Sequence, residues 1–339
     1  MSGVNVAVVG ATGAVGEEFL RLFELRKYPI KSLKLLASAR SAGKKLRFAG
    51  KDHTVEELKA DSFKGVEHAF FSAGGSISKE FAPHAAKAGA IIIDNTSAFR
   101  YEPEIPLVVP EINPKDAFEY GARRIVANPN CTTIVALLPT FPLHKQFGLK
   151  RAVMSSYQAI SGAGAQAMEE LEQQMRDWAA GRPLQVKISP KQIAFNVIPR
   201  IDSVQDNGYT KEEMKFLWEG RKIMHHEALR ATATCVRVPV LRSHSVSLNL
   251  EFERPVTPEQ AREILRSAPG VVVQDDPKAE LYPIPLERSL KDEIGVGRIR
   301  QDVSIDGNRG LCLWAVGDQI MKGAALNAIQ IGELLLKGK

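Results

Sequence analysis

The N-terminal segment constrains the fold most strongly, because it reads as a strand, a glycine turn and a helix in direct succession. Apolar residues 4–9 predict a strand, and Glu17 to Arg26 has helical character. Between them stand three glycines in the spacing GxxGxxG: Gly10, Gly13 and Gly16. Glycines let a backbone turn tightly and approach a pyrophosphate, whose charge is stabilised by the N–H groups and dipole of the helix start. The segment therefore predicts a nucleotide-binding unit.

The alternation of strands and helices continues after this unit. Strands are expected at 33–37, 68–72 and 90–94, with a helix at 78–87. This pattern is typical of a parallel sheet, whose ligands bind at the carboxyl ends of the strands. Arg100 stands in a loop at that edge, where it is either a ligand-binding cation or an ordinary solvated side chain.

The loop after the second strand bears on cofactor choice. NAD-preferring sites carry a carboxylate about 20 residues after the glycine turn, where it holds the ribose 2′-hydroxyl. This chain instead has Ser38, Arg40 and Ser41. A cation with two hydroxyls suits a 2′-phosphate, so we expect NADP, the alternative being a solvated loop.

The pattern changes in the second part of the chain, where longer strands with a two-residue period begin. Four strands are predicted: 151–157, 232–240, 245–252 and 311–320. Three helices are expected to lie against them, at 165–179, 211–226 and 258–267, and a last helix at 323–336. The pattern indicates an α+β domain with a largely antiparallel sheet.

Composition fits two globular domains in 339 residues, with 44% hydrophobic and 25% charged residues. The net charge is +6, but the basic groups are scattered without interleaved aromatic residues, which argues against nucleic acid. The three cysteines are far apart, so neither a disulfide framework nor a metal site is expected, and a reducing cytoplasm fits. We expect no secretory leader and no membrane span.

A cysteine stands at the start of a predicted helix. The chain reads Ala127-Asn-Pro-Asn-Cys131-Thr-Thr133 and then turns apolar. The free N–H groups and the dipole of a helix N-terminus favour a thiolate there. The alternative is a buried cysteine acting as a small hydrophobe. Polar flanks on both sides favour the nucleophile.

Three further sets of polar residues stand out. The first is Gln158, which ends a predicted strand beside a glycine-rich turn. The second is Arg237, within a strand, with His244 shortly after it, and the third is a pair on one helix. Glu219 and Lys222 share one face of a predicted helix. Each has an ordinary structural alternative, since most Glu–Lys pairs are surface ion pairs and most histidines are not catalytic.

Together these motifs resemble the aspartate-β-semialdehyde dehydrogenase family over nearly the whole chain. The resemblance rests on ordered segments at 10–16, 38–43, 94–100, 109–113, 128–133, 157–164, 237–244, 317–319 and 323–327. It implies a Rossmann-type NADP-binding domain over 1–130, completed by the C-terminal helix 319–339, and a catalytic and dimerisation domain over 131–318. One departure is Ala127, where the motif more often begins with serine.

The resemblance also implies roles for individual residues. Cys131 would be the nucleophile, His244 the acid/base and Gln158 the group that orients the substrate. Arg237 would bind the substrate carboxylate and Glu219 its ammonium group. The remaining implied substrate residues are phosphate ligands: Arg100, Lys222 and Asn130. The implied cofactor residues are Gly10, Thr12, Gly13, Ala14, Val15, Arg40, Ser41, Ser161, Gly162 and Gln319.

The implied reaction is the reversible, NADPH-dependent conversion of β-aspartyl phosphate to aspartate semialdehyde through a Cys131 thioester. It belongs to the biosynthesis of lysine, threonine, methionine and diaminopimelate, and the family works as a homodimer. One alternative is an N-acetyl-γ-glutamyl-phosphate reductase, although that family ordinarily has glycine where Asn130 stands and has no use for Glu219. The other is a non-catalytic paralogue, against which the intact polar residues count.

Overall fold

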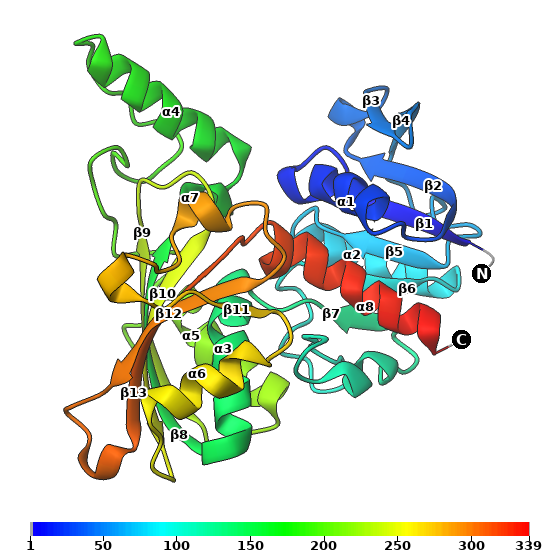
Figure 1. Cartoon of the computed structure of the whole chain (residues 1–339). Coiled ribbons are helices and arrows are strands. Elements are labelled where there is room, and N and C mark those ends of the chain that lie inside the picture. The colour runs from blue at the N-terminus through cyan, green and yellow to red at the C-terminus, as the bar shows by residue number, and fades with distance from the viewer. Residues whose placement is uncertain (1–2, 339) are drawn as a thin grey trace. The chain divides into compact units, whose positions relative to one another are not determined.

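The computed structural model describes residues 3–338 and divides into two compact units (Figure 1). The first comprises Met1–Asn130 with Ala324–Lys339, and the second comprises Cys131–Gly323. The first unit is built on a mostly parallel sheet and the second on a mostly antiparallel one. The predicted fold class, a Rossmann-type domain with an α+β domain, is therefore confirmed.

The first unit contains a seven-stranded sheet in the order β3-β4-β2-β1-β5-β6-β7, in which only the β3–β4 pair is antiparallel. Its strands are β1 Val4–Val9, β2 Ile30–Ala37, β3 Lys45–Phe48, β4 Lys51–Glu57, β5 His68–Phe71, β6 Ile91–Asp94 and β7 Ile125–Ala127. Its helical segments are α1 Ala14–Leu25, η1 Ala39–Ser41, α2 Gly75–Lys87, η2 Pro114–Phe118 and α8 Leu326–Lys337.

Sequence patterning identified four strands of this unit, but it missed β7, which is buried and only three residues long. β1, β2, β5 and β6 are present within a few residues of their expected bounds, because apolar runs mark strands covered on both faces. The hairpin of β3 and β4 was not predicted, since its residues are mostly charged and exposed. Its turn is made by Ala49 at φ 49° and Gly50 at φ 75°, the left-handed pair that a tight hairpin requires.

Helix α8 completes the first unit, although it comes from the far end of the sequence. The Asn327 side-chain amide donates to the carbonyl of Val108 at 2.9 Å and to Asn128 Oδ1 at 2.7 Å. Arg26, which follows α1, also pairs with Glu333 of α8 at 2.7 Å. These contacts attach α8 to the end of α1 and to Asn128, the residue that follows β7.

The second unit contains a six-stranded sheet in the order β11-β12-β13-β10-β8-β9. Its strands are β8 Leu149–Gln158, β9 Arg230–Arg237, β10 His244–Phe252, β11 Val271–Val273, β12 Ile294–Gln301 and β13 Gly310–Gly317. Its α-helices are α3 Cys131–Phe147, α4 Ala165–Ala179, α5 Lys211–Met224, α6 Pro258–Arg266 and α7 Pro285–Arg288. Its shorter helical turns are η3 Ile160–Ala163, η4 Pro277–Ala279, η5 Asp306–Asn308 and the π-helical η6 Met321–Ala325, whose last two residues belong to the first unit.

Two features of this unit differ from the sequence-based expectation. Helix α4 was expected on the sheet, but it packs against η3 and the segment around Ile193 in a small core of its own, and it projects from the sheet in Figure 1. Strands β11 and β12 were not predicted. In β12 the β-branched residues Ile294 and Val296 alternate with Gly295 and Gly297, which are uncommon inside strands, and β11 spans only three residues.

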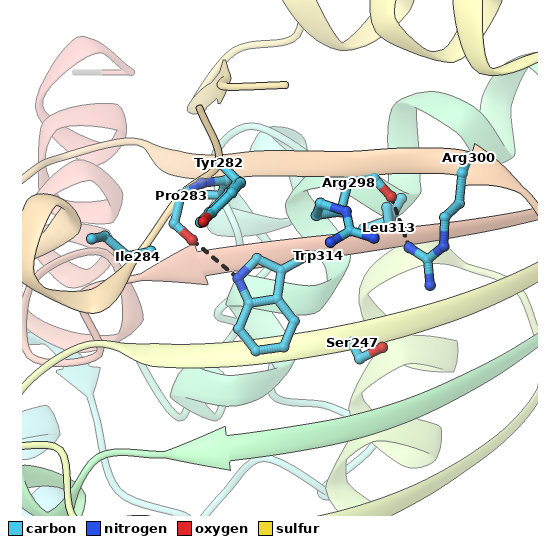
Figure 2. A pocket seen from close by; sticks show the side chains of 8 residues that line it. All are labelled: Ser247, Tyr282, Pro283, Ile284, Arg298, Arg300, Leu313 and Trp314. Carbon is cyan, nitrogen blue, oxygen red and sulfur yellow. Dashed lines mark hydrogen bonds between the residues drawn. The ribbon is translucent and has the colours of Figure 1, made fainter. Parts of the chain in front are cut away.

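Helices α3, α5 and α6 lie on one face of the six-stranded sheet (Figure 1). Along β10 the buried residues Val246, Leu248 and Leu250 alternate with the more exposed Ser247 and Asn249, which therefore belong to the other face. A cavity of about 320 Å³ lies on that outward face and is lined by Ser247, Trp314, Arg298 and neighbouring residues (Figure 2). Trp314 Nε1 donates to the carbonyl of Pro283 at 3.1 Å.

Across the described residues, 3–338, no helix combines the length and apolar character needed to cross a bilayer.

Candidate active site

The glycine turn of the first unit forms a cradle at the start of α1. A Cβ on Gly16 would stand 2.3 Å from the carbonyl oxygen of Gly10, so the turn can close only around glycine. A Cβ on Gly13 would meet only that oxygen, at 3.4 Å. The protein itself therefore tolerates a side chain at Gly13, and the close approach of a ligand is the reason to omit one. The predicted residues Ala14 and Val15 form the first turn of α1.

A cavity of about 370 Å³ lies beside this cradle, lined by Gly10, Thr12, Gly13, Ser38, Arg40 and Ser41 among others. Thr12 Oγ1 donates to Ser41 Oγ at 3.4 Å, which joins the turn to the loop after β2. Within residues 3–338, which the structure describes, no carboxylate lines this cavity. The donor set therefore fits an anionic ribose substituent better than a free 2′-hydroxyl.

Arg100 and Asn130 also belong to the first unit. Arg100 is buried, and its guanidinium Nη2 donates to the carbonyl of Asn95 at 2.8 Å. Nearby Asp94 is fully buried, and burial raises its pKa despite hydrogen bonds from Thr96 and Ser78. Asn130 is buried directly before Cys131.

Cys131 is the first residue of α3, as the sequence predicted. Its side chain is partly exposed, and a Cβ on Gly323 would stand 2.7 Å from Cys131 Cβ. The glycine that follows β13 therefore lies against the cysteine. Because the thiol sits at the N-terminus of a 17-residue helix, the helix dipole stabilises its thiolate.

The other two cysteines differ from Cys131. Cys235 in β9 is fully buried, and burial raises its pKa to about 12. Cys312 in β13 is also buried, and burial again raises its pKa. Since the thiolate is the reactive form, neither cysteine is a suitable nucleophile.

His244 is fully buried at the start of β10. Its Nδ1 accepts a hydrogen bond from the N–H of Ala159 at 3.1 Å, whereas its Nε2 has no hydrogen-bond partner within the described residues. Burial and the nearby Arg237 lower its pKa to about 3, although Glu212 opposes the shift. The ring is therefore neutral near pH 7, with its proton on Nε2.

Arg237 ends β9 close to this histidine. Its Nη1 donates to the carbonyl of Ala159 at 2.7 Å, and burial lowers its pKa. A Cβ on Gly162 would lie 2.9 Å from Arg237 Nη1 and 3.4 Å from His244 Nε2. The absence of a side chain at Gly162 thus leaves room for the guanidinium and the imidazole together.

Gln158 leads to two residues that the sequence reasoning missed, Glu212 and Lys215. Gln158 Nε2 donates to Glu212 Oε1 at 3.1 Å, and the Glu212 carboxylate also accepts from Thr132, next to Cys131. Lys215 Nζ lies 2.8 Å from Glu212 and 3.2 Å from Asp202. Both residues are buried in the first turns of α5.

The predicted pair Glu219 and Lys222 lies farther along the same helix. Seven residues of α-helix span about 10 Å, so this pair is displaced by that distance from Glu212 and Lys215. Both pairs have the same i,i+3 spacing, so the sequence alone does not show which pair belongs to the site. The hydrogen bonds of Gln158 go to Glu212 and Ser156, and we therefore revise the choice of acid to Glu212.

Gln319 connects two of the implied cofactor residues. Its Nε2 donates to Ser161 Oγ, and its Oε1 accepts from the N–H of Ser243 at 2.9 Å. Ser161 and Gly162 belong to η3, directly after Gln158. The amide of Gln319 thus joins the turn after β8 to the residue before His244.

Known protein families match most of this chain. A family model described as the NAD binding domain of semialdehyde dehydrogenase matches residues 5–120, and one described as the dimerisation domain matches 141–322. Aspartate-semialdehyde dehydrogenase of Aquifex aeolicus (strain VF5) is 51% identical, over 99% of this chain and 98% of the relative. The chain belongs to the aspartate-semialdehyde dehydrogenase family. Membership makes it an oxidoreductase of this class.

Other relatives and solved structures extend the match. The aspartate-semialdehyde dehydrogenase of Bacillus subtilis (strain 168) is 48% identical over 99% of this chain and 98% of that protein. Aspartate semialdehyde dehydrogenase II from Vibrio cholerae, solved in complex with ASA, superposes with a TM-score of 0.96 at 43% identity, covering 99% of each chain. The Candida albicans enzyme solved with NADP has a TM-score of 0.77 at 26% identity, covering 98% of each chain.

Proposed function

We propose that the chain reduces L-β-aspartyl phosphate to L-aspartate 4-semialdehyde with NADPH, reversibly, through a thioester on Cys131. The reaction would serve the biosynthesis of aspartate-family amino acids and diaminopimelate. Family membership supports the substrate, and the Vibrio cholerae relative was solved with ASA. The observation that carries the chemistry is a partly exposed thiol at a helix N-terminus in the same compact unit as a buried histidine whose Nε2 has no partner within the described residues.

The cradle and its cavity fit NADP. The turn of Thr12, Gly13 and Ala14 would hold the pyrophosphate, and Arg40 with Ser41 would hold the 2′-phosphate. Ser161, Gly162 and Gln319 would bind the nicotinamide side. When bound, the reduced cofactor supplies hydride to the thioester carbonyl carbon.

Cys131 would form the covalent bond. Its thiolate attacks the acyl carbon of the substrate, the C–O bond to phosphate breaks, and phosphate leaves with that electron pair. Burial lowers the pKa of Arg237, although the attraction of the Cys131 charge opposes this shift. By the same attraction, the Arg237 cation favours the thiolate of Cys131. Once the carbonyl carbon has been reduced, the tetrahedral adduct collapses, expels the thiolate and frees the aldehyde.

His244 would act on the substrate oxygen. With Nδ1 occupied by the Ala159 N–H, the neutral ring can only donate from Nε2. This donor stabilises the negative charge that develops on the thioester oxygen and shifts its proton toward that oxygen as the charge grows. Gln158, held by Glu212 and Ser156, would orient the acyl group.

Substrate recognition would depend on opposite charges at the two ends of the amino-acid head group. Arg237 offers a planar fork to the carboxylate, and Glu212, in place of Glu219, offers a carboxylate to the ammonium group. Lys215, in place of Lys222, would be a phosphate ligand, and Arg100 and Asn130 are kept as proposed phosphate ligands.

The direct test is an assay of NADPH formation from aspartate semialdehyde, phosphate and NADP. We expect turnover by the wild type, none without phosphate, and rejection of N-acetylglutamate semialdehyde under the same conditions. An acetylated amine would bring a neutral amide to buried Glu212, a mismatch that costs about 1–3 kcal/mol. Preference for the acetylated aldehyde would overturn the substrate assignment, and no turnover of either aldehyde would overturn the reaction.

Arg237→Lys sharpens this test. Lysine keeps the charge but cannot form two parallel hydrogen bonds with a carboxylate, so affinity for the semialdehyde and turnover should both fall. Unchanged kinetics in the lysine variant would remove Arg237 from the carboxylate site.

The second unit would also form a homodimer. The matched dimerisation domain contains the whole six-stranded sheet, whose outward face presents Tyr157 and Trp314 with ring centroids 5.4 Å apart. The cavity of Figure 2 opens on this face. We therefore place the contact with a second copy there.

A further inference from the structure

Asp318 is a fully buried carboxylate in the loop that follows β13. Its Oδ2 accepts from Arg242 Nε at 2.6 Å and from the N–H of Leu290 at 2.7 Å. Its Oδ1 accepts from the N–H groups of Ile320 and Met321 at 3.0 and 3.2 Å. One side chain thus joins three loops, including the one that enters β10.

Two of these loops contain backbone that L-residues rarely adopt. Ser243 has φ 76° and Leu290 has φ 64°, both in the left-handed region. Non-glycine residues persist there only when the surroundings hold them, and such positions cluster at functional sites. The N–H of Leu290 binds Asp318 directly, and Ser243 follows Arg242, which Asp318 binds.

Ser243 is also held from its other side. Its N–H donates to Gln319 Oε1 at 2.9 Å, and its hydroxyl lies 2.9 Å from that of Ser289. Gln319 is the neighbour of Asp318, so these two consecutive side chains fix both Arg242 and Ser243. His244 comes next in the chain, and the backbone angles of Ser243 set the direction in which its ring enters the site.

We infer that Asp318 is a positioning residue that holds the Arg242–Ser243 turn and thereby places the imidazole of His244. The inference rests on the proposed function of His244. The ring must satisfy two conditions together: Nδ1 must meet the Ala159 N–H, and Nε2 must stay beside Arg237 across Gly162. A small rotation at Ser243 would break the first contact and misdirect the second.

The alternative is that Asp318 is only a buried ion pair that stabilises the unit. The chain offers a matched control in Arg262 and Asp275, which lie 2.7 Å apart with side-chain exposures of 23% and 1%. Arg242 and Asp318 lie 2.6 Å apart, with exposures of 23% and 0%. Asp275 also accepts a backbone N–H, from Ile299, but its contacts do not lead to His244.

The experiment compares Asp318→Asn with Asp275→Asn in the full-length protein. Asparagine retains one oxygen but must turn an NH₂ group toward one of the two pairs of donors, and it removes the negative charge that pairs with Arg242, so the anchor of the turn is weakened in either orientation. We expect both variants to lose thermal stability, but only Asp318→Asn to lower kcat, by about 10- to 100-fold, with a smaller change in the KM for aspartate semialdehyde.

A second readout does not depend on turnover. Hydrogen exchange followed by mass spectrometry should show faster exchange of the amides of residues 242–246 in Asp318→Asn and no such change in Asp275→Asn. If Asp318→Asn does not fold, Arg242→Lys is measured in its place, since lysine keeps the charge but lacks the Nε donor.

Equal kcat losses in the two asparagine variants would overturn the inference. So would unchanged exchange at residues 242–246. A wild type that does not turn over the aldehyde would instead overturn the proposed function, while the exchange measurement would still decide whether Asp318 holds this turn.

Discussion

His244→Gln should make the protein less sensitive to acid unfolding. The imidazole titrates near pH 6.5 in an unfolded chain, whereas burial and Arg237 lower its pKa to about 3 in the folded protein. Between these values the unfolded state binds a proton that the native state does not. The free energy of unfolding therefore rises with pH in this window, by about 1.4 kcal/mol per pH unit.

The size of this loss in unfolding free energy depends only on the pKa of the imidazole in the unfolded chain. From about pH 7.5 to about pH 5, this one group should cost the wild type about 2 kcal/mol, because the native pKa lies well below the whole interval. Glutamine carries no titrating group, and its side-chain oxygen can still accept the N–H of Ala159. The His244→Gln variant should therefore lose about 2 kcal/mol less than the wild type over the same interval.

Urea unfolding at the two pH values measures this difference. His144, whose pKa burial also lowers, remains in every variant, so its contribution cancels in the comparison. His84→Gln, which removes an exposed imidazole, is the control for the histidine-to-glutamine change itself. An equal loss in wild type and His244→Gln would refute the neutral buried imidazole on which the proposed donor role depends.

Four further predictions concern the other sites. Cys131→Ala should abolish turnover while leaving NADP affinity within about twofold by calorimetry, and iodoacetamide should label Cys131 first in wild-type peptide maps, since burial raises the pKa of both other thiols. Arg40→Asp should weaken NADPH binding far more than NADH binding in fluorescence titrations, because it exchanges a cation for an anion near the 2′-phosphate; an unchanged ratio would make Arg40 an ordinary loop residue. Glu212→Gln should raise the KM for the semialdehyde at least about tenfold and Glu219→Gln much less, and the reverse order would restore Glu219 to the site. Trp314→Glu should yield monomers in light scattering after size-exclusion chromatography, whereas an intact dimer would move the interface to another face.

The sequence allowed much of the first unit to be predicted, because buried parallel strands have long apolar runs. Residues 4–9 and 90–94 left little choice of structure. Cys131 could be placed because polar residues, a proline and an apolar run mark a helix start. Helix α4 could not be placed, since its amphipathic pattern shows that one face is buried but not what covers it.

In the candidate site, too, some residues could be found from the sequence and some contacts could not. Arg237 and His244 stand near each other in sequence and meet across Gly162, but local spacing left each of them an ordinary structural alternative, and the family resemblance selected them. The contact of Gly323 with Cys131, and that of Gln319 with Ser243, join segments far apart in the chain. No local pattern carries such information.

Glu212 illustrates why chemistry alone could not complete the site. Helix α5 contains two acid–base pairs at the same spacing, two turns apart, and both acids are buried. Helical periodicity places both pairs on about the same face, because seven residues nearly complete two turns. Only the axial position along the helix separates them, and a tertiary contact helps to set that position: Glu213, in the capping box with Thr210 at the start of α5, accepts the N–H of Cys235 in β9. The docking of the helix start on β9, which periodicity does not reveal, therefore brings Glu212 rather than Glu219 to Gln158.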